Sequence, residues 1–237
     1  ELFEKFYLEA AAAGDEVLGI FLSHELSGTW QCAKLAADLA NVDNVLFVDS
    51  ATVCLGESLL VRLAVQLRDA GKTLVQIATD LEHAKEHLHL VAAIDDLKYL
   101  RKGGRIKPLI TIKDGKVAMA GKARGLPGAY VALFKKIEEL GGISPDFAAV
   151  AGYSSSLREV QPIENYFREN LHMGEPLVRQ IGCVIGRAKS GSLRAARLVF
   201  LQRETGADSL SQSLTVLPAP SERESLARPA LTALRPR

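Results

Sequence analysis

The chain has 237 residues, of which 48% are hydrophobic and 24% are charged. This composition is typical of a globular protein that buries a core, and it excludes a disordered chain, a collagen and a disulfide-rich scaffold. The 29 basic residues nearly balance the 28 acidic residues, for a formal net charge of +1, so the chain as a whole does not predict nucleic-acid binding.

The cysteines indicate a reducing compartment. Cys32, Cys54 and Cys183 are far apart in sequence and form no CxxC pair, which favours neither a disulfide framework nor a zinc site. No apolar run reaches the roughly 18 residues that a membrane span needs, and no signal peptide opens the chain. We therefore expect a cytoplasmic protein without a transmembrane segment.

The first part of the chain alternates helix and strand patterns. Apolar residues at helical spacing predict four helices, at 2–13, 30–40, 57–71 and 73–88. Near-continuous apolar runs at 17–22 and 45–50 are typical of parallel strands buried on both faces. This order of elements predicts an α/β fold with a parallel sheet.

The pattern changes near Leu90. Two runs around Asp114-Gly115, within 108–123, carry the strongest short hairpin signal in the chain. Other strands are expected at 90–94, 147–153 and, as the last one, 177–186, with helices at 95–105, 129–142 and 157–171. A hairpin among such strands indicates an α+β unit with a mixed sheet.

We therefore predict an α/β protein of two domains and a tail. Residues 1–89 form an incomplete N-terminal domain with the parallel sheet, and residues 90–203 form a C-terminal α+β domain. Residues 187–237 hold one Lys and eight Arg against four acids, and the closing stretch has four prolines and no aromatic residue. Because such a segment cannot bury enough apolar surface to offset its chain entropy, residues 204–237 are predicted to be a disordered tail.

The segment SHELSGTW, residues 23–30, is the strongest candidate for a binding site. It follows a buried strand and precedes a helix, the place where open α/β sheets bind ligands. The hydroxyls of Ser27 and Thr29 and the helix N-terminus favour an anion, and Gly28 lets the backbone come close. The alternative is that Ser27 or Thr29 only caps the helix.

Catalytic and metal-site alternatives are weaker. Ser23, His24 and Asp49 are the residue types of a serine nucleophile, but no GxSxG motif is present and adjacent side chains seldom activate one another. His83 and His87 share a helix face without a third ligand, so no metal site is predicted.

Four segments in order resemble the DegV family of bacterial fatty-acid-binding proteins, which includes the acyl-carrying subunits of fatty acid kinase. The matching segments are LSGTW (26–30), VDSATVCLGESLLV (48–61), LKYLRKGGRI (97–106) and KPLITIKDGKVAMAGKARG (107–125). The resemblance spans roughly residues 1–186, which is more specific than any one motif.

The chain also departs from the family pattern. The family's amino-terminal DS(T/S) strand and TSQP segment have no counterpart here, and more than a dozen residues are expected between Ile106 and Lys107. The family's HxGxG motif is replaced by residues 186–191, which contain no histidine.

The resemblance implies a lipid-binding subunit with no catalytic residues and no cofactor. A long-chain fatty acid, for example palmitate, would lie in an apolar tunnel with its carboxylate at Ser27, Gly28 and Thr29. Arg105 and Arg124, on glycine-flanked loops, would face the catalytic subunit of the kinase, which forms the acyl phosphate. The alternative function is a small-molecule phosphotransferase or a serine hydrolase that uses the Ser27 turn.

Overall fold

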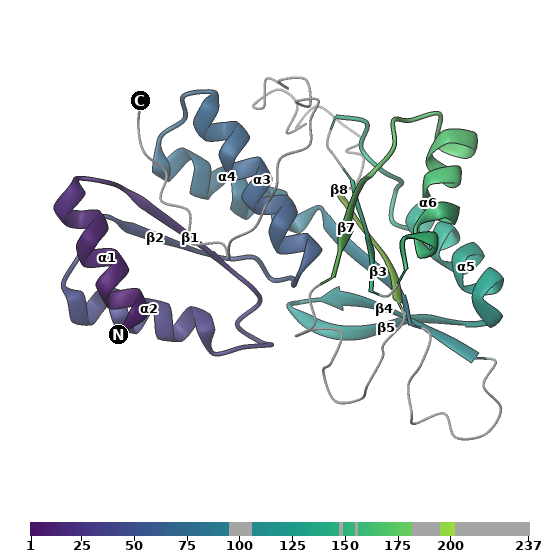
Figure 1. The fold of residues 1–237 in the computed structure, drawn as a ribbon, viewed down its shortest axis with the longest axis horizontal. Helices are drawn as coiled ribbons and strands as arrows, with labels where there is room; N and C mark the ends of the chain where they lie inside the picture. Colours follow the sequence, from purple (N-terminus) through teal and green to yellow (C-terminus); the bar gives the residue numbers. More distant parts are fainter. Residues whose placement is uncertain (95–105, 147–148, 155, 182–194, 202–237) are drawn as a thin grey trace.

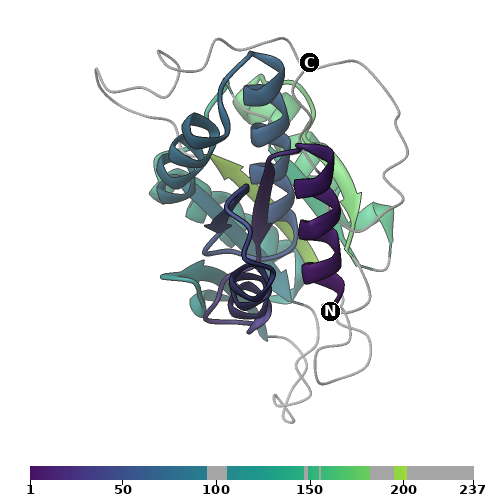
Figure 2. The same ribbon diagram turned by 90° about the vertical axis from the view of Figure 1, so that its left-hand side faces the viewer.

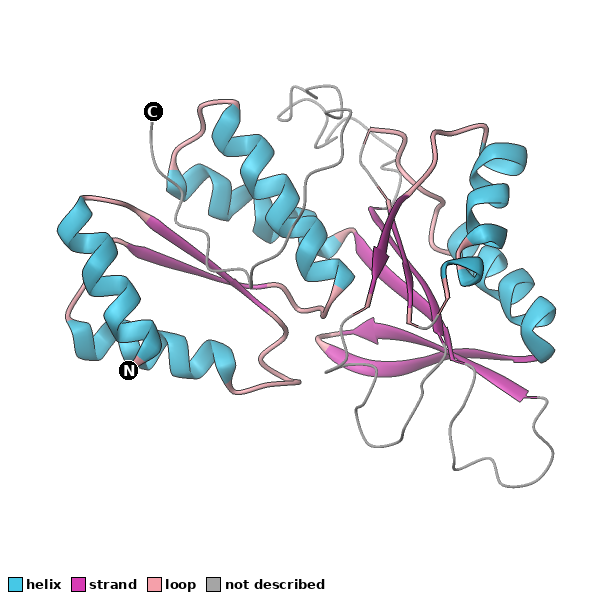
Figure 3. Cartoon of the chain, in the orientation of Figure 1, coloured by secondary structure: helices cyan, strands magenta, loops and turns pink. Residues whose placement is uncertain are grey.

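The computed structural model describes residues 1–94, 106–146, 149–154, 156–181 and 195–201. Within them, helices flank two sheets, one of two strands and one of six (Figures 1 and 3). The predicted helix at 95–105 and the predicted disordered tail lie outside the described residues.

The two-stranded sheet is parallel, as predicted. Strands β1 (Val17–Phe21) and β2 (Val45–Asp49) pair in register from Val17 opposite Val45 to Phe21 opposite Asp49. Helices α1 (Leu2–Ala13) and α2 (Thr29–Ala40) pack on one face of this sheet, and α3 (Leu55–Asp69) and α4 (Leu74–Glu86) pack on the other. Figure 2 views the molecule from the side of α1 and α2.

The alternation of side chains along β1 and β2 explains these two layers. Val17 and Val45 join the cluster under α1 and α2, whereas the next residues, Leu18 and Leu46, pack against α3 and α4. Successive strand residues point to opposite faces, so a run that is apolar at every position needs helices on both sides. The predicted apolar strands are therefore confirmed as a sheet covered on both faces.

The predicted helix ends also have physical causes in the structure. Gly14 ends α1 in the left-handed conformation, at φ 72°, and its N–H donates to the carbonyls of Ala10 and Ala11. Thr73 starts α4 with a capping box, in which Thr73 and Gln76 each accept a backbone N–H from the other.

The second sheet is mixed, as predicted. Its order is β5-β4-β3-β8-β6-β7, and only β6 and β7 are paired in parallel. The strands are β3 (Leu88–Ile94), β4 (Ile106–Lys113), β5 (Lys116–Arg124), β6 (Val150–Tyr153), β7 (Leu177–Gln180) and β8 (Ala195–Leu201). The predicted hairpin is confirmed: Asp114 and Gly115 join β4 and β5 with φ of 50° and 73°, the left-handed pair of a tight hairpin turn. Strand β4 runs unbroken through Ile106 and Lys107.

Two sequence predictions are wrong. Residues 177–186 were expected to be the last strand, but β8 follows at 195–201 and lies between β3 and β6, in the interior of the sheet. Pairing with two distant strands is a long-range property that local pattern does not reveal. The single helix expected at 157–171 is split into a 3₁₀ turn, α6 (Gln161–Tyr166) and a π turn. Pro162 accounts for the first break, because proline favours the first turn of a helix and disrupts a helix interior.

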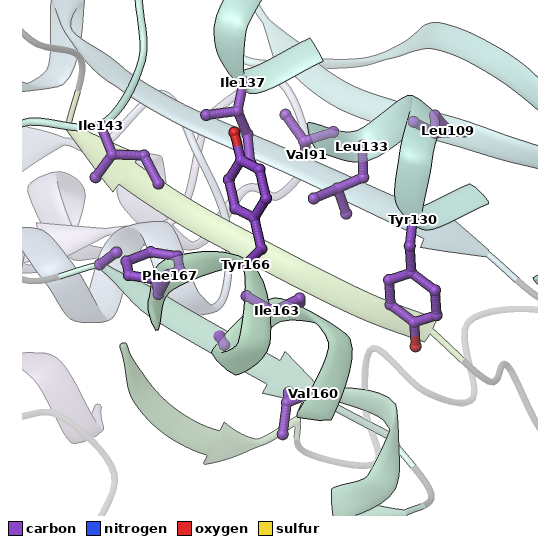
Figure 4. Packing of buried hydrophobic residues seen from close by; sticks show 12 residues of the cluster. Val91, Leu109, Tyr130, Leu133, Ile137, Ile143, Val160, Ile163, Tyr166 and Phe167 are labelled. Atoms are coloured by element: carbon purple, nitrogen blue, oxygen red, sulfur yellow. The ribbon is translucent and has the colours of Figure 1, made fainter. Parts of the chain in front are cut away.

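The six-stranded sheet also has helices on both faces. Helices α5 (Gly125–Glu139) and α6 cover one face, where Leu133, Ile137 and Ile163 are fully buried (Figure 4). On the other face, Leu55 and Leu59 at the start of α3 pack with Leu90 and Ala92 of β3 and Val150 of β6.

Helix α3 therefore contacts both sheets. Its later residues Leu60, Leu63 and Leu67 pack between α4 and the two-stranded sheet. Its first residues, Leu55 and Leu59, pack on the six-stranded sheet. This places the loop before α3, and with it the carboxyl ends of β1 and β2, next to the second sheet.

Candidate functional site

The candidate site lies where β1 and β2 end. The loop after β1 and the loop after β2 are tied together, because the N–H of Ser50 donates to the carbonyl of Phe21 at 2.9 Å and the N–H of Ser23 donates to that of Thr52 at 2.8 Å. Ser23, Ser50 and Thr52 are buried. The two loops, residues 22–28 and 50–54, are thus hydrogen-bonded to each other before helix α2 begins. We call these two loops the platform.

A pair of hydroxyls stands at the start of α2. Ser27 Oγ lies 2.8 Å from Thr29 Oγ1, and the N–H of Thr29 donates to Ser27 Oγ at 3.3 Å. Gly28 is the N-cap residue, and a Cβ atom there would meet nothing within 4 Å. The N-cap is therefore neither Ser27 nor Thr29, and α2 has no side-chain capping hydrogen bond. Ser27 accepts one N–H of the first turn, and the pair still has one O–H that can donate to a ligand.

The β4–β5 hairpin turn is packed against this platform. A Cβ atom on Gly115 would lie 2.5 Å from Ser23 Oγ and 3.4 Å from Glu25 Cγ. The ammonium of Lys116 lies 3.2 Å from a carboxylate oxygen of Glu25. This contact joins segments about ninety residues apart, so no local pattern in the sequence could indicate it.

His24 and Asp49 join the two loops with side chains. His24 Nδ1 hydrogen-bonds Asp49 Oδ2, and Asp49 Oδ1 accepts the backbone N–H groups of His24 at 3.3 Å and Ala51 at 3.0 Å. Ser23 Oγ instead accepts the N–H of Glu25 at 3.2 Å. Among the described residues, no hydrogen bond joins Ser23 to His24. The acid and the imidazole of a catalytic triad are therefore paired here, but Ser23 is not hydrogen-bonded to that imidazole.

Of the two candidate arginines, the structure describes Arg124, which is not next to the hydroxyl pair. Arg124 is exposed at the far end of β5, where it precedes α5 and pairs with Ile106. The nine residues of β5 separate it from the hairpin turn by about 27 Å at the usual rise of a strand. Arg105 lies outside the described residues.

Sequence reasoning missed one unusual carboxyl group. Glu57, in the first turn of α3, has its pKa raised from 4.5 to about 7 because burial penalises the charged form. The backbone just before it is strained, since Cys54 has φ 61° and ψ −111°. Only tertiary packing around the start of α3 produces this environment.

Other chemistries find little support in the described part of the chain. No three His, Cys, Asp or Glu side chains there are grouped so that they could hold a metal ion. None of its helices is both long and apolar enough to span a bilayer.

Comparison with known proteins finds relatives over most of the chain. A family model described as an uncharacterised protein of the DegV family matches residues 1–191. A DegV domain-containing protein of Deinococcus radiodurans is 34% identical over 167 residues, which are 63% of this chain and 59% of that protein. One from Streptococcus pyogenes is 28% identical over 201 residues, 77% of this chain and 69% of that protein. The chain thus spans less than two thirds of the Deinococcus relative.

Solved structures share the fold. A DegV family protein from Thermus thermophilus, described as fatty acid binding, superposes with a TM-score of 0.71 at 26% identity, covering 84% of this chain and 75% of that one. The fatty acid kinase B3 protein of Streptococcus pneumoniae, loaded with linoleic acid, superposes with a TM-score of 0.70 at 16% identity, covering 84% and 76%. At that identity the second likeness concerns the fold alone.

Proposed function

Because this chain belongs to the DegV family, whose model covers residues 1–191, we propose that it binds a long-chain fatty acid such as palmitate. The observation that carries this proposal is the shared fold and 26% identity with the Thermus thermophilus protein that is described as fatty acid binding. The bound acid would be presented to a separate kinase, which forms the acyl phosphate.

The carboxylate would lie at Ser27, Gly28 and Thr29. The two hydroxyls are 2.8 Å apart and share one hydrogen bond, so the second O–H is available to a carboxylate oxygen. The first N–H groups of α2 have no partners inside the helix and form the positive end of its dipole, which favours a negative ligand. The open space at Gly28 supports a direct approach to these backbone groups.

The acyl chain would pack against apolar side chains beside this platform. The cluster of Leu55, Leu59, Leu90 and Ala92 begins directly after the loop that carries Ser50 and Thr52. Each buried CH₂ group contributes about 0.8 kcal/mol, so a tunnel lined this way binds a palmitoyl chain with few polar contacts. Polar protein groups would then be needed only around the carboxylate of the fatty acid.

The protein would be a binding subunit without its own catalysis. The separation of Ser23 from the His24–Asp49 pair gives no support to a serine hydrolase. Arg105 and Arg124 would face the kinase, and the exposed position of Arg124 away from the hydroxyl pair supports a role toward a partner.

We also propose the two-domain division that the sequence predicts. We place the N-terminal domain at residues 1–89 and the C-terminal domain at 90–203, with the carboxylate site facing the second domain. The start of β3, a strand of the second sheet, at Leu88 supports a boundary close to residue 89.

The chain contains one tryptophan, Trp30, which follows Thr29 and so reports on the site directly. Titration with palmitate should change its fluorescence with a saturable curve, and native mass spectrometry of the purified protein should detect a co-purified fatty acid. A protein without co-purified lipid and without saturable palmitate binding would overturn the proposal. Turnover of an ester or a phosphate substrate without any partner would favour the enzymatic alternative.

A further inference from the structure

His24 and Asp49 form a hydrogen-bonded pair that the proposed function does not use. The Asp49 carboxylate is fixed at the end of β2, because its Oδ1 accepts the backbone N–H groups of His24 and Ala51. Its Oδ2 is hydrogen-bonded to Nδ1 of the imidazole. A carboxylate only accepts hydrogen bonds, so Nδ1 carries the hydrogen and the neutral imidazole has its free lone pair at Nε2.

The imidazole lies at the start of α2. The N–H of Ser27 donates to the carbonyl of Ser23 at 3.2 Å, so His24 and Ser27 are three residues apart on one helix-like turn. Side chains at this spacing are neighbours on the surface of a helical turn. The imidazole also lies beside the ring of Trp30 in the first turn of α2, with the two ring centres 6.1 Å apart. Both observations place it beside the hydroxyl pair.

Nε2 of this imidazole can be reached by a ligand. The His24 side chain is 46% exposed, whereas that of Asp49 is 16% exposed. Within the described part of the chain, Nε2 has no hydrogen-bond partner: Glu25 Oε1 is 3.6 Å away, which is too long for a hydrogen bond. The other carboxylate oxygen of Glu25 lies 3.2 Å from the Lys116 ammonium.

The charged groups around His24 cancel one another. Those that the structure describes, linked to the imidazole directly or through its neighbours, are three acids and three lysines: Asp49, Glu25 and Glu82, and Lys116, Lys85 and Lys34. With a neutral imidazole this group has no net charge, and a carboxylate ligand would make it negative. A proton on His24 balances that added charge, because a nearby opposite charge favours the charged form of a titratable group.

We propose that His24 takes up a proton from solvent when a fatty-acid carboxylate binds, and that its Nε2–H then donates to that carboxylate. Asp49 holds the Nδ1–H throughout, so the proton is gained and released only at Nε2. This role, which rests on the proposed function, adds a cationic donor to the hydroxyls and N–H groups at Ser27, Gly28 and Thr29. By linkage, the proton and the carboxylate raise each other's affinity by the same factor.

Calorimetric titration of the full chain with palmitate, in buffers of different ionisation enthalpy, counts the protons taken up on binding. Imidazole ordinarily changes charge between about pH 5 and 8. We therefore expect proton uptake by the wild type, and an affinity that falls on the order of tenfold from pH 6 to pH 8. His24→Gln keeps a polar side chain that cannot take up a proton, so it should show little uptake and little pH dependence. Protons that palmitate itself exchanges are the same in both proteins, so their difference isolates the imidazole.

Two matched controls remove other groups that titrate in this range. His83 is an exposed histidine of α4, and burial raises the pKa of Glu57 to about 7. His83→Gln and Glu57→Gln should keep the proton uptake and the pH dependence of the wild type.

Palmitate binding by the wild type without proton uptake would overturn the assignment, and this result needs no variant. Equal uptake by the wild type and His24→Gln would also overturn it, as would loss of uptake in Glu57→Gln alone. The proposed function is separable, because saturable palmitate binding supports it whatever the proton count. A complete absence of binding at pH 6 and pH 8 would overturn both.

Discussion

Gly115 packs closely against Ser23, although the two residues lie in loops of different sheets: a Cβ atom on Gly115 would lie 2.5 Å from the hydroxyl oxygen of Ser23. Ser23 is fully buried, at 0% exposure, so its hydroxyl has little room to move. Gly115 also has φ 73°, which side-chain-bearing residues rarely adopt. One glycine thus closes the hairpin and allows it to rest on the candidate site.

Gly115→Ala should therefore destabilise the protein. The left-handed conformation and the close contact with Ser23 together should lower the free energy of unfolding by about 2 kcal/mol. Gly121→Ala in the same hairpin is the control, because it has no positive φ and no neighbour within 4 Å of a Cβ atom. Urea unfolding measures the free energy of unfolding of both variants. Equal values for the two would contradict the close packing of Gly115 against Ser23.

Ser27→Ala should weaken fatty-acid binding with little effect on the fold. A hydrogen bond to a charged group is worth about 1.5–3 kcal/mol, which corresponds to about a ten- to hundredfold loss of palmitate affinity. Trp30 fluorescence measures the affinity. Ser58→Ala, on the exposed side of α3, is the matched control and should bind as the wild type does. Unchanged affinity in Ser27→Ala would restrict the role of this serine to its two hydrogen bonds with Thr29.

Ionisation of Glu57 should lower the free energy of unfolding as the pH rises. Burial raises its pKa to about 7 in the folded chain, against 4.5 for the ordinary side chain, so unfolding releases a proton between these values. Its contribution is fully present below pH 4.5 and is lost as the pH rises through 7. Glu57→Gln stays neutral, and at pH 8 it should be more stable than the wild type by about 1–2 kcal/mol. Glu57 is only partly buried, so water around its carboxylate keeps this gain below the full value of the pKa difference.

Unfolding of Glu57→Gln at pH 8 and pH 4.5 measures this effect. The difference from the wild type should approach zero at the lower pH. Glu86→Gln, at an exposed position of α4, should change the free energy of unfolding by less than about 0.5 kcal/mol at both pH values. A pH-independent gain in Glu57→Gln would point to packing instead of ionisation.

Arg105→Ala and Arg124→Ala should separate lipid binding from coupling. We expect both variants to keep the palmitate affinity of the wild type and to lose acyl-phosphate formation in an assay reconstituted with the kinase, because a guanidinium holds phosphate or carboxylate through two hydrogen bonds. Arg158→Ala, an exposed arginine elsewhere, is the control. A variant that loses lipid binding but keeps coupling would reverse this division of roles.

The sequence by itself determined the elements whose physical causes are local. Gly14 ended the first helix because only glycine takes the left-handed cap easily, Asp114-Gly115 closed the hairpin for the same reason, and the apolar runs at 17–22 and 45–50 became strands covered on both faces. The segment 26–30 also identified the strand end where the candidate site lies.

Tertiary structure alone decided the relations between distant segments. Strand β8 entered the middle of the second sheet, Gly115 came to rest on Ser23, and the start of α3 buried Glu57 enough to raise its pKa. Periodicity reports how a residue relates to its neighbours in the chain, whereas pairing partners, close approach and desolvation depend on which segments pack together, and that is a property of the whole fold.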